Sequence, residues 1–147
     1  CKINPISEYL TNDNINLLIE SDIIIDTTDD WRTSKIINKF CVEESIKYIF
    51  SSAINFNIQI CLFKNNKHTC LNCLFPNDEE ADLARCETVG ISSVCAGIAG
   101  LITAQKAINT ILDIKDENNI LTIINTTDFN VNNITVKNNA NCLLNNS

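Results

Sequence analysis

The sequence predicts an α/β fold, the second half of a doubly wound sheet extended by antiparallel strands on its C-terminal side. The first reason is residues 22–28, where three consecutive isoleucines stand between polar residues, as in a parallel-sheet strand that is buried on both faces. The second reason is the order of the patterns, because a helical pattern follows this strand and mostly strand patterns come after it. The chain should therefore contain a βαβ unit and an added antiparallel part.

The N-terminal half predicts three more strands and two helices. Residues 3–10 alternate loosely enough for a strand, and residues 11–13 can cap a short helix. Residues 48–54 and 56–63 predict two further strands, and the alternation in the second one indicates a sheet with at least one wetter face. The main helix follows the strand at residues 22–28 and precedes the strand at 48–54, and Thr28 or Asp29 can cap it. Its apolar residues recur at helical spacing: Trp31, Ile36, Ile37, Phe40, Cys41 and Ile46.

The C-terminal half predicts a cysteine turn, a long helix and a hairpin. Residues 70–73 form the turn, and the acidic residues 76–85 form a polar connection. Residues 89–112 are small and apolar, which indicates a helix buried in the core or against a second subunit. Residues 120–124 and 131–136 predict a hairpin that closes the fold.

Composition limits the classes of function. The chain has 147 residues, of which 45% are hydrophobic and 20% are charged, and this suits one globular domain. Its net charge of -7 is spread without a block of like charge, which argues against nucleic acid or a membrane surface as a partner. No run approaches the ~18 apolar residues that a membrane span needs. A Cys-x-x-Cys pair in an α/β pattern favours metal or thiol chemistry in a reducing cytoplasm.

The three glycines point to a chain that is a fragment. A phosphate-binding turn needs glycine at a helix N-terminus, because only glycine lets backbone amides approach the oxygens. Gly90, Gly97 and Gly100 all lie in or at the start of the long predicted helix, and the sequence has no Met. We therefore expect residues 1–147 to be the C-terminal portion of a larger nucleotide-binding domain whose glycine-rich half lies upstream.

Two aspartates are candidate ligands for a nucleotide and its metal. Asp29 and Asp30 follow the most hydrophobic strand, and ligands of open α/β sheets bind at the carboxyl ends of strands. Paired carboxylates there could hold Mg²⁺ against phosphate oxygens. The alternative is that they cap the following helix, whose dipole favours acidic residues in its first turn. Taken alone, the residues favour neither interpretation.

Cysteines supply the second candidate site. Cys70 and Cys73 have the spacing of a zinc knuckle, and Cys142 is a plausible third ligand. Three residues beyond it stands Asn145, a poor zinc ligand, so His68, Cys61 or water could complete the tetrahedron. The alternative is a set of reduced structural thiols, since buried free cysteine is common.

A third candidate is Cys86, which precedes the long helix. The helix N-terminus and Arg85 favour its thiolate, which is how a nucleophilic cysteine is activated, whereas Glu87 opposes it. Cys1, Cys41, Cys61 and Cys95 lie in apolar stretches and are expected in the core.

Several of these features together resemble the MoeB/ThiF/HesA family, the prokaryotic relatives of ubiquitin-activating enzymes. The resemblance covers the whole chain but only the C-terminal part of the family's length. It rests on five segments in family order: Asp26-Thr27-Thr28-Asp29-Asp30-Trp31, Asn38-Lys39-Phe40-Cys41, Cys70-Leu71-Asn72-Cys73-Leu74-Phe75-Pro76, Cys86-Glu87-Thr88-Val89-Gly90-Ile91 and Ala104-Gln105-Lys106-Ala107-Ile108.

The resemblance implies a Rossmann-like adenylyltransferase that uses ATP and Mg²⁺ to activate the C-terminal glycine of a ubiquitin-like sulfur carrier. It would serve molybdenum-cofactor or thiamine biosynthesis or tRNA thiolation, as a cytoplasmic homodimer. Asp29 matches the family's Mg²⁺ aspartate, and Asp30 stands where the family usually has Asn beside the nucleotide. Cys86 matches a cysteine that forms a covalent intermediate in some members.

The resemblance also assigns the metal ligands and shows three departures. Cys70, Cys73 and Cys142 match three of the family's four zinc ligands, and Asn145 replaces the fourth. Ser34 falls where the family usually has Arg. These departures, with Asp30, motivate an alternative: a non-catalytic member that binds a carrier as an assembly scaffold.

Overall fold

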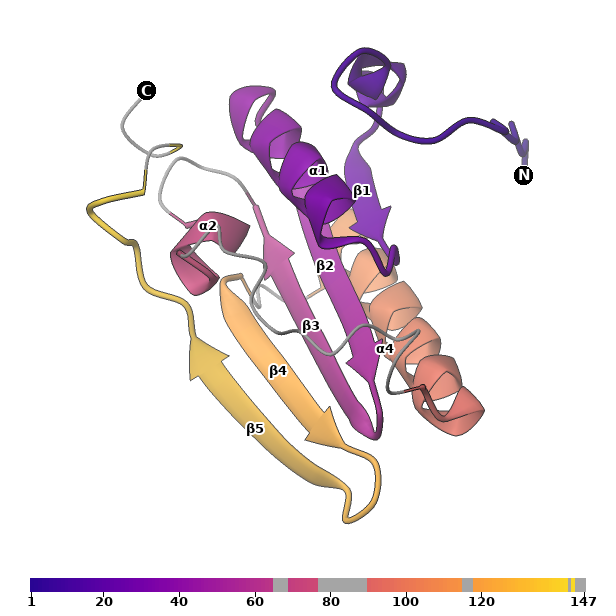
Figure 1. Cartoon of the computed structure of the whole chain (residues 1–147), viewed down its shortest axis with the longest axis vertical. Coiled ribbons are helices and arrows are strands. Elements are labelled where there is room, and N and C mark those ends of the chain that lie inside the picture. The colour runs from indigo at the N-terminus through magenta and orange to yellow at the C-terminus, as the bar shows by residue number, and fades with distance from the viewer. Residues whose placement is uncertain (65–68, 77–89, 115–117, 143, 145–147) are drawn as a thin grey trace.

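The computed structural model describes residues 1–64, 69–76, 90–114, 118–142 and 144 (Figure 1). Its centre is a five-stranded sheet in the order β1-β2-β3-β4-β5. Helices α1 and α2 cover one face of the sheet, and α4 covers the other (Figure 1). The strands are β1 (Ile23–Asp26), β2 (Lys47–Ile54), β3 (Asn57–Phe63), β4 (Ile120–Asn125) and β5 (Asn130–Thr135). The helices are the 3₁₀ helix η1 (Ile15–Leu18), α1 (Trp31–Glu43), α2 (Leu71–Leu74) and α4 (Ser93–Ile111).

Strand directions confirm the predicted mixture of parallel and antiparallel pairing. β1 and β2 are parallel, with Ile23 opposite Lys47, and α1 connects them as a βαβ crossover. All other neighbouring strands in the described sheet are antiparallel. The hairpin of β4 and β5 lies in the predicted position and extends the sheet. The carboxyl ends of β1 and β2 lie at the same edge of the sheet. This is the edge at which the sequence predicts a ligand site, next to Asp29 and Asp30.

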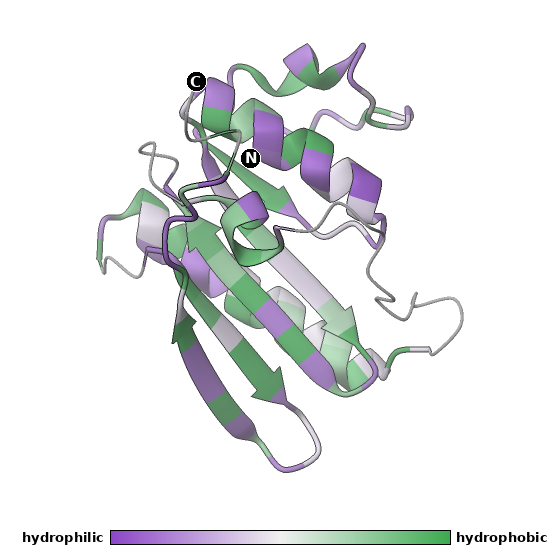
Figure 2. Cartoon of the chain, turned by 60° about the vertical axis from the view of Figure 1, so that its left-hand side comes forward, coloured by the Kyte–Doolittle hydropathy of each residue, from purple (hydrophilic) through white to green (hydrophobic). Residues whose placement is uncertain are grey.

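Alternation along the central strands divides the interior into two cores. On β2, Tyr48 and Phe50 face α1, whereas Ile49 points to α4. β3 repeats the division with Phe63 on the α1 side and Ile60 on the α4 side. Green and purple residues alternate along other parts of the strands in Figure 2, where one face is less covered. Covering both faces explains why the inner strands are so apolar.

Two predictions about the N-terminal part are wrong. Residues 3–10 form no strand, because no neighbouring strand in the described chain pairs with them and Ile3, Ile6 and Tyr9 are exposed, with Tyr9 at 95%. β1 is not buried on both faces, since Ile25 is 42% exposed. β1 lies at the edge of the described sheet, where one side is less covered.

The structure also moves two boundaries. α1 ends at Glu43, and Ser45 then adopts a φ of 57°, so Ile46 belongs to the following turn and not to the helix. On β3 the wetter face is confined to the first half. Asn57 is exposed, whereas Cys61 is fully buried on the same face because α1 and α2 cover it.

α4 is buried on one side only. Cys95, Ala99, Thr103 and Ala107 recur every four residues and pack toward β2 and β3. On the outer side, Leu101 is 75% exposed. By length and apolarity alone the helix could cross a membrane, but its inner side packs on the sheet as a core helix does. Of the two predicted settings, the core or a second subunit, the structure shows the core, and only the inner side of α4 is buried there.

Candidate nucleotide edge and cysteine cluster

The turn after β1 is organised by a buried carboxyl group. Asp26, the last residue of β1, is 1% exposed. Its Oδ1 atom accepts hydrogen bonds from the backbone N–H of Thr28 at 2.9 Å and from the Thr28 hydroxyl at 2.7 Å. Its Oδ2 atom accepts the hydroxyl of Tyr48 at 2.8 Å. Burial, followed by the charge of Asp26, raises the pKa of Tyr48 well above its ordinary value. Three donors thus hold the turn at the end of β1.

Asp30 is the N-cap of α1. Its carboxylate accepts the backbone N–H groups of Arg32 at 3.3 Å and Thr33 at 3.0 Å, and also the Thr33 hydroxyl at 2.6 Å. The Thr33 hydroxyl is the main cause of the lowered pKa of Asp30. The expectation that Thr28 or Asp29 caps the helix is therefore wrong by two residues or one, whereas the alternative that the aspartates cap the helix holds for Asp30. Both carboxylate oxygens of Asp30 are engaged with the first turn.

Asp29 lies exposed between the Asp26 turn and the Asp30 cap. The start of α4 reaches the same edge of the sheet, because the N–H of Ser92 donates to the carbonyl of Asn55, directly after β2. Helix N-termini favour negative charge. The exposed Asp29 carboxylate and the start of α4 therefore lie at the carboxyl edge of the β1-β2 pair, while Asp30 caps the start of α1. An exposed carboxylate at this edge suits a divalent cation bound with a phosphate group.

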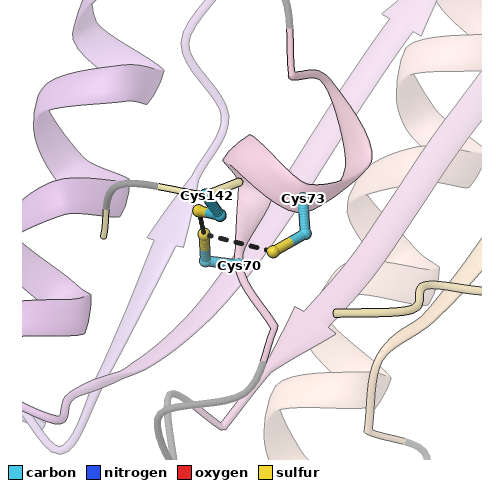
Figure 3. Close-up of side chains that lie close together, drawn as sticks. All are labelled: Cys70, Cys73 and Cys142. Atoms are coloured by element: carbon cyan, nitrogen blue, oxygen red, sulfur yellow. Dashed lines mark hydrogen bonds between the residues drawn. The ribbon is translucent and has the colours of Figure 1, made fainter. Parts of the chain in front are cut away.

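Three cysteine sulfurs form a separate cluster (Figure 3). The Sγ atom of Cys70 lies 3.9 Å from that of Cys73 and 3.6 Å from that of Cys142. All three Sγ atoms lie within 4.8 Å of one another. Cys70 and Cys73 flank the start of α2, where the N–H of Cys73 donates to the Cys70 carbonyl. Cys142 comes from the segment after β5, so the cluster ties the end of the chain to the α2 turn.

The cluster fits a metal ion. Zn–S bonds of about 2.3 Å at a tetrahedral angle place two sulfurs about 3.8 Å apart, close to the distances observed. Burial raises the pKa of the Cys70 thiol to about 12. A metal ion that bound here would have to displace protons from the thiols. The three cysteines therefore could hold a metal, and each of them is a free thiol in the structure.

Other candidate residues lie elsewhere. Cys61 is fully buried on β3 and is not part of the cysteine cluster, so it is not the fourth ligand among the described residues. Cys41, Cys61 and Cys95 are in the core as expected, but Cys1 is exposed, contrary to the prediction. Cys86, His68 and Asn145 fall outside the described residues.

Sequence reasoning missed the residues that connect the two sites. Asn38 is fully buried on α1, and its Oδ1 atom accepts the N–H of Leu71 at 2.9 Å. The ammonium of Lys35 lies 3.3 Å from the carbonyl of Phe75. A polar residue within the apolar stripe of a helix was the available signal for Asn38. Nothing in the local pattern of Lys35 marked its partner 40 residues later.

Together, the fold and the sites define a class of protein: an α/β domain with a polar edge after its first strand and a thiol cluster on a turn that packs against its crossover helix. Comparison of sequences is more specific. The profile of the ThiF family matches residues 1–144, and the chain belongs to that family.

Several similar proteins are named adenylyltransferases. The chain is 30% identical over 115 residues to a "Probable molybdopterin-synthase adenylyltransferase" of Gracilaria tenuistipitata var. liui, covering 78% of this chain and 32% of that protein. It is 26% identical over 116 residues to the "Sulfur carrier protein ThiS adenylyltransferase" of Escherichia coli (strain K12), covering 78% of this chain and 46% of that protein. The chain thus spans less than half the length of these relatives.

Solved structures confirm the fold. Escherichia coli MccB crystallised with ATP superposes with a TM-score of 0.77 and 15% identity, over 95% of this chain and 44% of that chain. MccB crystallised with MccA superposes with a TM-score of 0.74 and 15% identity, over 92% of this chain and 42% of that chain. At this identity the likeness concerns the fold alone.

Proposed function

We propose that the protein is an ATP-dependent adenylyltransferase that activates the C-terminal glycine of a ubiquitin-like sulfur carrier. The observation that carries the proposal is the exposed Asp29 at the carboxyl edge of the β1-β2 pair, in a chain of the ThiF family whose named relatives are adenylyltransferases. The family match and the carboxylate at the ligand edge support the same chemistry. The pathway, molybdenum-cofactor or thiamine biosynthesis or tRNA thiolation, would follow from the carrier.

In the proposed reaction a carboxylate oxygen of the carrier attacks the α-phosphorus of ATP, and pyrophosphate leaves. Mg²⁺ would neutralise phosphate charge when bound. Asp29 is the residue of this chain proposed to hold it, because its carboxylate is exposed at the edge. Asp30 contributes by fixing the first turn of α1, since both of its oxygens accept hydrogen bonds there. Cys86 is proposed as the thiolate that attacks the acyl-adenylate, so that the acyl group becomes a thioester on its sulfur and AMP leaves.

Zinc is the proposed occupant of the cysteine cluster. Three cysteine sulfurs, with Cys70 3.6 Å from Cys142 and 3.9 Å from Cys73, support a tetrahedral soft-metal site. Its role would be structural, because Cys142 comes from the C-terminal segment and Cys70 from the turn before α2. The metal would pin these segments together.

The proposal places the protein in the cytoplasm as a homodimer. Exposed apolar side chains along the outer side of α4, among them Val94, Leu101 and Ile108, support burial against a second copy. The oligomeric state of the full-length protein, measured by sedimentation at several concentrations, tests this part. A monomer at every concentration would contradict it.

ATP–pyrophosphate exchange by the full-length protein with candidate carriers tests the activity. We expect exchange that depends on a carrier ending in Gly-Gly and that is lost in Asp29→Ala. Asp22→Ala is the matched control, because Asp22 is an exposed aspartate at the opposite end of β1. Absence of exchange with every carrier, in folded protein, would reject the activity.

A scaffold without catalysis is the second candidate. The resemblance leads one to expect an arginine at Ser34. Ser34 is instead a short side chain, 2% exposed beside Tyr48, and cannot reach a nucleotide as an arginine would, which favours the scaffold. A scaffold would bind the carrier and not ATP. Calorimetric titration of the full-length protein with each ligand separates the two candidates.

A further inference from the structure

One face of helix α1 contacts the α2 turn and the residue after it, Phe75. Trp31, Lys35 and Asn38 are four and three residues apart, which places them on one face of the helix. Each of them contacts the segment from Leu71 to Phe75. The helix that begins at the candidate nucleotide edge is therefore also the support of the α2 turn.

The contacts at the N-terminal end of this face are specific. The rings of Trp31 and Phe75 meet edge to face, with centroids 5.3 Å apart and an interplanar angle of 90°. The Nζ atom of Lys35 lies 5.0 Å from the Trp31 ring centroid and 3.3 Å from the Phe75 carbonyl oxygen. Lys35 thus contacts both aromatic residues at once.

A backbone hydrogen bond also holds Phe75 to the α2 turn, residues 71–74. The backbone N–H of Phe75 donates to the carbonyl of Leu71 at 2.9 Å, and Phe75 follows Cys73 by two residues. Leu71, directly after Cys70, donates its own N–H to Asn38. A shift of Cys70 or Cys73 would therefore displace the partners of α1.

The contacts between the α2 turn and α1 reach the candidate nucleotide edge through the first residue of α1. Trp31 directly follows Asp30, whose carboxylate accepts the N–H groups of the first turn of α1. A displacement of Trp31 would move that turn and with it the neighbouring Asp29.

We propose that Trp31, Lys35 and Phe75 are positioning residues that couple the cysteine cluster to the Asp29–Asp30 turn, so that a metal ion in the cluster tightens ATP binding. The nucleotide part rests on the proposed function. A metal that fixes three sulfur atoms restricts the turn that carries Phe75, and Phe75 then holds the start of α1. Because coupling between two binding sites is reciprocal, ATP tightens metal binding by the same factor.

The test uses full-length protein labelled with fluorotryptophan, with the Trp31 resonance assigned by its loss in Trp31→Phe. Metal is removed with a chelator under reducing conditions, and the chelator is then removed by buffer exchange. Adding Zn²⁺ should shift the fluorine resonance of Trp31 although Trp31 is no ligand. ATP, titrated with Mg²⁺, should bind roughly fivefold more tightly to zinc-loaded than to metal-free protein, the lower end of ordinary coupling factors.

Phe75→Leu should retain metal binding, observed with Co²⁺ through its thiolate absorption, but lose the Trp31 shift and the difference in ATP affinity. Phe56→Leu, a half-exposed phenylalanine in the turn between β2 and β3, is the matched control and should behave as wild type. If Phe75→Leu does not fold, Lys35→Met replaces it and should likewise lose the Trp31 shift and the difference in ATP affinity. Lys35→Arg, which keeps the positive charge, should show both effects as wild type does.

An unmoved Trp31 resonance in wild-type protein would overturn the proposal. Equal ATP affinity of folded metal-free and zinc-loaded protein would overturn it as well. If no sample binds ATP, the proposed function and the nucleotide part of this proposal both fail, whereas the Trp31 shift still shows whether the metal site acts on α1.

Discussion

The hydroxyl of Tyr48 donates a 2.8 Å hydrogen bond to the Oδ2 atom of Asp26, and both side chains are almost completely buried. The pair joins the two parallel strands, because Asp26 ends β1 and Tyr48 lies near the start of β2. A buried carboxyl oxygen that loses its donor cannot find water as a replacement. The hydroxyl is therefore important for stability at the edge that carries the candidate nucleotide site.

Tyr48→Phe should lower the free energy of unfolding by about 2 kcal/mol, the usual cost of leaving a buried polar group without its partner. Urea denaturation of the full-length protein, followed by circular dichroism, measures the change. Tyr9→Phe is the matched control, because Tyr9 is 95% exposed and its variant should unfold as the wild type does. A loss in Tyr48→Phe no larger than in this control would contradict the prediction.

Two core thiols should make the protein less stable at alkaline pH. Burial raises the pKa of Cys41 and of Cys61 to about 12, from an unfolded value near 8.5. The folded state therefore holds these protons when the unfolded state releases them. Their stabilising effect is complete below about pH 8.5 and falls as the pH rises toward 12.

The free energy of unfolding should decline between about pH 8.5 and 11 by roughly 1.4 kcal/mol per pH unit for each thiol. Cys41→Ala should reduce this slope, although it also lowers stability at neutral pH. Cys1→Ala, which removes an exposed thiol, should leave the slope unchanged. An unaltered slope in Cys41→Ala would show that the thiol does not cause it.

The cap of α1 gives a third prediction. Asp30→Ala should cost about 1 kcal/mol, because two backbone N–H groups lose their acceptor. Asp30→Asn should recover most of that loss. The lowered pKa of Asp30 means that its stabilising effect is present above its unfolded pKa of about 3.9 and is lost as the pH falls through the lower folded value. Thermal unfolding of the three proteins at pH 7 and pH 3 checks both statements. A full effect of Asp30→Ala at pH 3 would be inconsistent with them.

The cysteine cluster predicts about one bound metal ion per chain. Metal analysis of full-length protein purified under reducing conditions should find it, and Cys142→Ser should weaken retention because one of three thiolates is lost. Cys95→Ala, at a buried thiol on α4, should retain the metal. Equal metal content in Cys142→Ser and wild type would rule out the cluster as the site.

The pattern of the sequence was sufficient to predict most of the fold. The isoleucine run of β1, the helical spacing of α1 and the alternation on β3 each reflect local geometry, and the structure has an element at each place. Residues 3–10 show the limit of such patterns. Their alternation resembles a strand, but a strand forms only with a pairing partner, and pairing is a long-range property.

The candidate sites likewise contain local features that the sequence predicts and long-range contacts that it does not. The spacing within Cys70-x-x-Cys73 is local and predicted a pair of neighbouring sulfurs, and Cys142 joined them as expected. The contact of Lys35 with the carbonyl of Phe75 spans 40 residues and has no sequence pattern of its own. The choice of Asp30 as the cap depended on a one-residue difference in where the first turn begins, which local propensity does not resolve.

A buried pair of hydroxyl groups fixes α4 against the sheet. The hydroxyl of Thr103 donates to the hydroxyl oxygen of Ser51 on β2 at 2.9 Å, between otherwise apolar surfaces. Thr103→Val should cost about 1 to 3 kcal/mol, because it leaves the Ser51 hydroxyl without its partner, whereas the double variant with Ser51→Ala should recover much of the loss. Urea denaturation of the two single variants and the double variant gives the coupling energy. Additive losses would show that the two hydroxyl groups do not depend on each other and that packing alone holds α4.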